Sequence, residues 1–250
     1  RDRLLIGRRE ASNALLPEES HAVAVHEAGH ALVAALSEHA DPVAKITILP
    51  RGAALGVTEQ LPTTERHLYP VSYLTDSLAV RLGGRAAEVI VLGEASTGAA
   101  NDLAGATDLA TRMVREWGLS AEVGPIGYGP DGPSRDNPFA GRSYAEATQR
   151  SIDTEVARLL REAEASAAAL LREHLDKLGR LTDLLIERET IDGSELAAIV
   201  GMTEGVPVEG LSIVPRAVAM AATSAPDDMN RGTLPAATSP RPDRPVVRLP

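Results

Sequence analysis

The segment VAVHEAGHALVAA, residues 23–35, contains two histidines four positions apart, with a glutamate directly after the first. Side chains four apart are separated by about 40° around an α-helix, so the imidazoles of His26 and His30 can both face one point. The side chain of Glu27 is rotated by roughly 100° from that of His26 and lies beside that point. The spacing is typical of two metal ligands and a neighbouring base.

Zinc is the metal that such a pair of histidines favours. In catalytic sites zinc holds three protein ligands and a water, whose pKa it lowers to about 7, and Glu27 is suited to accept the proton of that water. Chance produces this motif in roughly 1% of chains of this length and composition. The alternative hypothesis is structural, because both histidines share a stripe with Val23 and Val33, and a buried helix can hold histidines by bonds to carbonyl groups.

A catalytic zinc site needs a third ligand, which the motif does not supply. The chain has no cysteine, so disulfides and thiolate ligands are excluded and the third ligand has to be His, Asp or Glu. Glu88 and Asp102 stand out, because they flank a loop between two expected helices, but composition does not choose between them. The candidates by residue type are His21, His39, His67, Glu88, Asp102, Asp108 and His174.

Length and charge restrict the class of protein further. The 250 residues suffice for one sizeable domain with a real core, and the net charge of −10 makes nucleic acid an unexpected partner. No run of eighteen apolar residues occurs, so we expect a soluble piece without a membrane span or signal peptide. The two lysines, Lys45 and Lys177, do not follow glycine, so the chain has no phosphate-binding P-loop. The start at Arg1 rather than Met leads us to expect a segment upstream.

Local patterns predict a mainly α domain with a small β-hairpin and the HEAGH motif on a central helix. Pro17 and two following glutamates favour a helix that runs to about residue 36. Residues 43–49 and 55–61 have strand patterns on either side of a turn, which predicts the hairpin. Further helices are expected at 71–92, interrupted or closely packed at Gly83 and Gly84, at 102–117 with Gly118 as its cap, at 144–174, from there to about 189, and after the capping residues Asp192 and Glu195.

Two segments lack any helix or strand pattern. Residues 124–141 are dense in glycine and proline and are predicted to form a long irregular connection. From Thr203 onward the chain carries eight of its seventeen prolines and balanced charges, so residues 203–250 are predicted to be a disordered or loosely attached tail. The folded domain is therefore expected to span residues 1–202.

Five segments, in this order, resemble the peptidase domain of the FtsH-type AAA+ zinc metalloproteases. They are HEAGHALV, DPVAKITILPRGAALGVT, LGGRAAE, STGAANDL and MVREWGLSAEVGPIGY, and the resemblance runs from about residue 1 to residue 201. It implies that His26, His30 and Asp102 bind one zinc ion per chain and that Glu27 is the general base. The family usually reads AEE where this chain has Glu88 followed by valine, so the resemblance leaves a supporting role open for Glu88 alone.

The resemblance also implies how the whole protein works. It implies a zinc endopeptidase that degrades unfolded or membrane proteins by means of a zinc-activated water, assembled as a homo-hexamer. An upstream AAA+ ATPase module, absent from this chain, would bind ATP and feed the ring with unfolded polypeptide. A transmembrane anchor would place the full-length protein at the cytoplasmic side of the cell membrane.

Two alternative functions and one structural question stay open at this stage. The chain could be a catalytically secondary oligomerisation module, with the helices of residues 144–189 as packing elements, or a free-standing zinc hydrolase of small amides. A pure scaffold has no need to keep two histidines, a glutamate and an aspartate in the family pattern. The strand at 55–61 either holds an extended substrate by β-augmentation or is an ordinary strand over the core.

Overall fold

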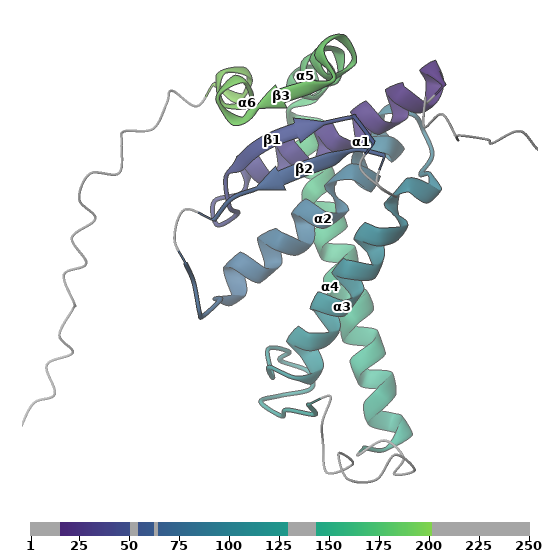
Figure 1. Ribbon diagram of the computed structural model, residues 1–250. Helices are drawn as coiled ribbons and strands as arrows, with labels where there is room; N and C mark the ends of the chain where they lie inside the picture. Colours follow the sequence, from purple (N-terminus) through teal and green to yellow (C-terminus); the bar gives the residue numbers. More distant parts are fainter. Residues whose placement is uncertain (1–15, 51–54, 63–64, 130–143, 202–250) are drawn as a thin grey trace, which may run out of the picture. The chain divides into compact units, whose positions relative to one another are not determined.

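The computed structural model describes residues 16–50, 55–62, 65–129 and 144–201, and there the chain is mainly helical with one small sheet, as the sequence predicts (Figure 1). The tail predicted for 203–250 lies outside the described residues, as does much of the irregular connection predicted for 124–141. In chain order the elements are α1 (Pro17–Leu36), β1 (Val43–Thr47), β2 (Val57–Gln60), α2 (Val71–Val91), the short 3-10 helix η2 (Thr97–Ala99), α3 (Ala100–Arg115), α4 (Glu146–Glu173), α5 (Leu175–Arg188), β3 (Thr190–Asp192) and α6 (Gly193–Val200).

The central helix is α1, which carries the HEAGH motif in its middle. Its start is fixed by Pro17 and by Glu19, whose carboxylate accepts a hydrogen bond from the backbone N–H of Leu16 at 2.8 Å. Every residue from Ala24 to Ala34 is buried, because α2, α5, α6 and the sheet all pack against this helix. Burial on all sides explains why the helix is built from alanine, glycine and valine rather than from one apolar stripe.

Glycines bring α1 and α2 unusually close together. A β-carbon on Gly29 would lie 2.5 Å from the carbonyl oxygen of Gly83, and one on Gly83 would lie 2.9 Å from the carbonyl oxygen of Gly29. A β-carbon on Gly84 would lie 2.6 Å from the Nε2 atoms of both His26 and His30. Of the two predicted roles for the α2 glycines, close packing is therefore correct and interruption is wrong, because α2 continues through both.

Over the described residues, the sheet has three antiparallel strands in the order β2-β1-β3 (Figure 1). The predicted hairpin of β1 and β2 is confirmed, with Ile46 opposite Thr58. The sequence did not reveal β3, which pairs Ile191 with Ile46 on the other side of β1. Three residues are too few to show a strand pattern, and β3 forms because Ile191 is buried against the central strand.

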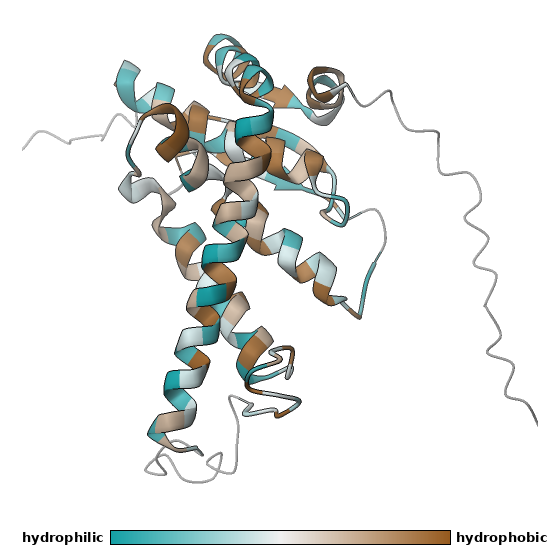
Figure 2. Cartoon of the chain, turned by 180° about the vertical axis from the view of Figure 1, so that it is seen from behind, coloured by the Kyte–Doolittle hydropathy of each residue, from teal (hydrophilic) through white to brown (hydrophobic). Residues whose placement is uncertain are grey.

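The remaining helices cover α1 and α2. A second apolar cluster lies between α2, α3 and α4 and includes Leu78, Met113 and Ile152. Brown and teal residues alternate along α4 in Figure 2, as expected for a helix with one buried and one exposed side. Near the end of the described chain, Asp192 caps α6 by accepting hydrogen bonds from two backbone N–H groups, which confirms the predicted cap. None of the described helices is both long and apolar enough to cross a membrane.

Candidate metal centre

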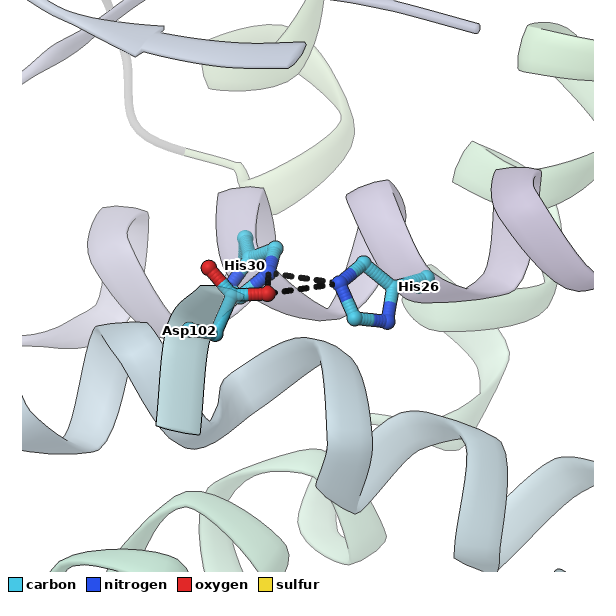
Figure 3. Close-up of side chains that lie close together, drawn as sticks. All are labelled: His26, His30 and Asp102. Carbon is cyan, nitrogen blue, oxygen red and sulfur yellow. Dashed lines mark hydrogen bonds and ion pairs between the residues drawn. The ribbon is translucent and has the colours of Figure 1, made fainter. Parts of the chain in front are cut away.

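Three of the predicted site residues converge at one point between α1 and α3 (Figure 3). His26 and His30 extend from the middle of α1, and Asp102 lies in the first turn of α3. The two histidine Nε2 atoms are 3.0 Å apart, and Asp102 Oδ2 lies 3.1 Å from Nε2 of His26 and 3.4 Å from Nε2 of His30. Ligand atoms bound tetrahedrally to one zinc ion at about 2.1 Å are roughly 3.4 Å from each other, so this spacing is close to that of a ligand set.

The contacts on the far side of each imidazole determine where its proton lies. Nδ1 of His30 is 2.7 Å from the carbonyl oxygen of Val80, which can only accept, so this nitrogen carries the proton; the N–H of Gly84, at 3.4 Å, is a much longer contact. Nδ1 of His26 is 2.7 Å from Oε1 of Glu88. In the neutral rings both Nε2 atoms therefore carry a lone pair, which is directed toward the carboxylate oxygen Oδ2 of Asp102.

Three lone-pair atoms at 3.0–3.4 Å from each other repel unless a cation lies between them. Two imidazole nitrogens and one carboxylate oxygen, without a thiolate, are a donor set that zinc accepts in catalytic sites. The residues present therefore fit a zinc ion better than the structural alternative, in which carbonyl groups would hold the histidines. Among the residues that the structure describes, these rings have one hydrogen-bond contact to a carbonyl, and it lies on the side away from the convergence point.

The pKa values of His26 and Asp102 reflect the same crowding of hydrogen-bond acceptors. Burial by itself lowers the pKa of His26, but a protonated ring donates hydrogen bonds to both Asp102 and Glu88, which outweigh burial and raise this pKa above its ordinary value. Burial acts to raise the pKa of Asp102, yet the hydrogen bonds that protonated histidines donate to it hold this pKa well below the usual range. Both shifts mean that this cluster stabilises added positive charge.

Glu88 lies behind His26 rather than among the converging atoms. It is buried, and its carboxylate accepts hydrogen bonds from the backbone N–H of Ser96 at 2.5 Å and from the Ser96 hydroxyl at 3.0 Å. Ser96 also caps η2, the short helix that leads into Asp102. Glu88 therefore connects the orientation of His26 to the loop that carries Asp102.

The other candidates for a third ligand lie elsewhere. His39 pairs with Asp76, and His174 stands at the junction of α4 and α5. The residues His21, His67 and Asp108 are exposed, and among the described residues they belong to no group that could hold an ion. Within the described ranges, the cluster of Figure 3 is the one set of three such side chains close enough to share a metal.

Glu27 is buried beside the cluster and faces β2. Its Oε2 atom accepts a hydrogen bond from the hydroxyl of Thr58 at 2.7 Å. Burial raises the pKa of Glu27, and the nearby histidines and the Thr58 bond offset part of this rise. A carboxylate with a raised pKa is a stronger base, which is the property needed to take a proton from water.

A cavity of about 780 Å³ surrounds these groups. α1, β2, α2 and the η2–α3 segment contribute to its wall. On one side it reaches Tyr73, whose hydroxyl donates to Asp41 at 2.7 Å, and Arg66 pairs with the same carboxylate at 3.2 Å. Val57, Thr58 and Gln60 of the edge strand β2 also line it, so a chain lying along that edge would pass the cluster.

Comparison with known proteins finds relatives that match most of this chain. The model of peptidase family M41 matches residues 13–199. The ATP-dependent zinc metalloprotease FtsH of Acidothermus cellulolyticus is 60% identical over 213 residues, which are 84% of this chain and 32% of the relative. The protein of the same name from Acidimicrobium ferrooxidans is 48% identical over 223 residues, 86% of this chain and 33% of the relative. FtsH 4 of Sorangium cellulosum is 46% identical over 209 residues, which are 82% of this chain and 32% of the relative. The chain thus spans about a third of the length of these curated relatives.

Proposed function

Because the chain belongs to peptidase family M41, we propose that it is the zinc-dependent endopeptidase domain of an FtsH-type ATP-dependent protease. The observation that carries this proposal is the convergence of two imidazole nitrogens and a carboxylate oxygen at 3.0–3.4 Å beside a buried glutamate. Such a grouping has no structural purpose without a cation, and it supplies both the ligands and the base that peptide hydrolysis needs.

In this function His26, His30 and Asp102 hold the zinc ion. When bound, zinc polarises a peptide carbonyl and makes a water acidic enough to be deprotonated near neutral pH. Glu27 takes the proton of the attacking water on its carboxylate and delivers it to the leaving amine. Glu88 keeps the proton of His26 on Nδ1, so that Nε2 stays available as a ligand.

The substrate is proposed to be an extended, unfolded polypeptide. β2 is an edge strand of the sheet within the described residues, and three of its residues line the cavity. A peptide that adds to this edge gains backbone hydrogen bonds that do not depend on its side chains, which suits low sequence selectivity. This supports the β-augmentation hypothesis over the alternative of an ordinary edge strand.

The longer protein is proposed to work as a homo-hexamer with an AAA+ ATPase module upstream of this domain. The ATPase module is supported by the name of the relatives, ATP-dependent zinc metalloprotease, because the residues of this chain include no P-loop that could bind ATP. ATP would act only through that module, which would deliver unfolded or membrane proteins, and a membrane anchor would place this domain on the cytoplasmic side. Residues 1–202 form the peptidase domain in this proposal.

Zinc content and peptide hydrolysis test the catalytic proposal against the oligomerisation module. The chain is expected to bind about one zinc ion and to cleave unfolded casein. Glu27→Gln is nearly isosteric but cannot accept a proton, so it is expected to keep the zinc and lose the cleavage. Full turnover by Glu27→Gln would remove the general base from the proposal, and zinc-loaded wild-type chain without any cleavage would favour the oligomerisation module.

A further inference from the structure

We propose that Thr58 is a positioning residue for the catalytic carboxylate, in that its hydroxyl fixes one oxygen of Glu27 and thereby aims the other at the attacking water. This inference rests on the proposed role of Glu27 as general base. It adds a residue from the sheet to a site whose other members lie on helices and on the loop before α3.

The contact between Thr58 and Glu27 is short and has one best acceptor. The Thr58 hydroxyl lies 2.7 Å from Oε2 of Glu27 and 3.2 Å from the backbone carbonyl oxygen of the same residue. A hydroxyl has a single proton to donate, and a charged carboxylate at the shorter distance is the stronger acceptor. The hydroxyl therefore bonds mainly to Oε2, and Oε1 keeps its lone pairs for a water.

Glu27 depends on this bond for its orientation. No described arginine or lysine pairs with its carboxylate, and within the described ranges Thr58 provides its sole hydrogen bond. The terminal torsion of a glutamate is broad and roughly two-fold, so the carboxylate plane is not set by the side chain's own rotamers. Without the hydroxyl the plane can rotate within the cavity.

Gly56, two residues before Thr58, leaves room for the same Glu27 carboxylate. A β-carbon on Gly56 would lie 2.7 Å from both Cγ and Oε1 of Glu27, so the missing side chain leaves the space that Oε1 occupies. Residues two apart in an extended segment face the same side, which places Gly56 and Thr58 together against the carboxylate. The strand itself is held by β1, where Thr58 lies opposite the fully buried Ile46. The Glu27 carboxylate therefore packs against a strand that its pairing with β1 holds in place.

A structural role for the Thr58 bond predicts something different. If the bond only fastened β2 to α1, its loss would lower stability and leave the chemical step unchanged in the molecules that stay folded. If the bond orients the base, its loss lowers kcat with little effect on KM, because substrate binding along the strand edge does not need the hydroxyl.

The main experiment compares three variants of the chain with unfolded casein as substrate. Thr58→Val keeps the shape and removes the donor, and kcat is expected to fall about tenfold or more, with KM and zinc content unchanged. Thr58→Ser retains the hydroxyl and is expected to keep most of the wild-type kcat. Thr47→Val is the matched control, because Thr47 is a buried threonine of the neighbouring strand whose hydroxyl contacts Glu189 and Thr190 instead; it is expected to keep kcat.

Two further measurements do not rely on Thr58→Val activity. Gly56→Ala forces the flexible end of Glu27 to move, so this variant is expected to fold, bind zinc and lose kcat. In denaturant unfolding, the double variant of Thr58→Val and Glu27→Ala is expected to shift the midpoint by less than the sum of the two single shifts, since each removes the same bond.

Wild-type kcat in both Thr58→Val and Gly56→Ala, alongside an inactive Glu27→Gln, would overturn the positioning role and leave the proposed function intact. Additive midpoint shifts in the double variant would count against the bond itself. Full activity of Glu27→Gln would instead remove the proposed general base, so the two failures are distinguishable.

Discussion

Replacing Gly84 with alanine is predicted to weaken zinc binding strongly while leaving the helical fold in place. The added β-carbon would lie 2.6 Å from Nε2 of His26, from Cε1 of the same ring and from Nε2 of His30. Ordinary carbon–nitrogen contacts are about 3.4 Å or longer, so the rings have to retreat by roughly 0.8 Å. Zinc–ligand distances tolerate only about ±0.2 Å, and the methyl group also takes space next to the convergence point.

The size of the loss follows from this comparison. Indirect changes around a metal ligand typically cost 10–100-fold in metal affinity, and Gly84→Ala moves two ligands directly. We expect the zinc affinity to fall by more than about 100-fold, which corresponds to roughly 2.7 kcal/mol or more. The measurement is a competition titration with a chromogenic zinc chelator at pH 7, accompanied by far-UV circular dichroism.

Other glycines provide matched controls for the fold. Gly179 on α5 has nothing within 4 Å of its added β-carbon, so Gly179→Ala is expected to keep both zinc and stability. At Gly29 the β-carbon would meet the backbone of α2 at 2.5 Å, which cannot yield as a side chain does, so Gly29→Ala is expected to lower the melting temperature strongly. Wild-type zinc affinity in a folded Gly84→Ala variant would refute the placement of the ion between the two Nε2 atoms.

Three further predictions concern the ligand set, the pH dependence of stability and the energy source. Asp102→Ala leaves two imidazoles and is expected to lose most zinc by metal analysis and all casein cleavage; full zinc and full activity would direct the search to Glu88. The hydrogen bond from Arg158 lowers the pKa of Glu155, so the ionised carboxylate adds stability above its unfolded-state pKa of about 4.3, and this contribution is lost as the pH falls through the lower folded-state pKa. Glu155→Gln is therefore expected to be less stable than wild type in urea at pH 7 and to approach wild type as the pH falls below about 4, and an unchanged difference at low pH would contradict this assignment. Cleavage of casein by the chain is expected to be indifferent to ATP, and a stable folded protein is expected to resist with or without ATP, because it exposes an extended stretch only in rare open states; ATP-stimulated digestion of the folded protein would show that the chain is not an isolated peptidase domain.

Local sequence patterns were enough to predict α1, the β1–β2 hairpin and the cap at Asp192, because each depends on residues close together in sequence. The position of the two HEAGH histidines on one side of a helix follows from the same local rule. The choice between Glu88 and Asp102 did not follow, since both flank one loop and differ only in which side of His26 they reach. Resemblance to a family, rather than spacing, indicated Asp102.

Contacts between distant segments could not be read from a single sequence. β3 is stabilised by its pairing with β1, about 145 positions earlier in the chain, and leaves no pattern of its own. The bond between Thr58 and Glu27 joins a strand to a helix, and nothing in the strand pattern distinguishes Thr58 from an ordinary β-branched residue. In both cases the deciding information is tertiary.

The small residues of α1 and α2 connect the fold to the chemistry. Two imidazoles in the buried middle of a helix need a partner for each Nδ1 and open space at each Nε2. Gly29 and Gly83 allow the two helices to approach until the carbonyl oxygen of Val80 reaches His30 at 2.7 Å. Gly84, one turn after Val80 on α2, leaves the space next to the Nε2 atoms that a larger residue would fill. The same close packing that excludes water from the core therefore fixes the proton of His30 on Nδ1 and leaves space at the proposed metal position, so larger residues at these glycines would affect the proposed site as well as the core.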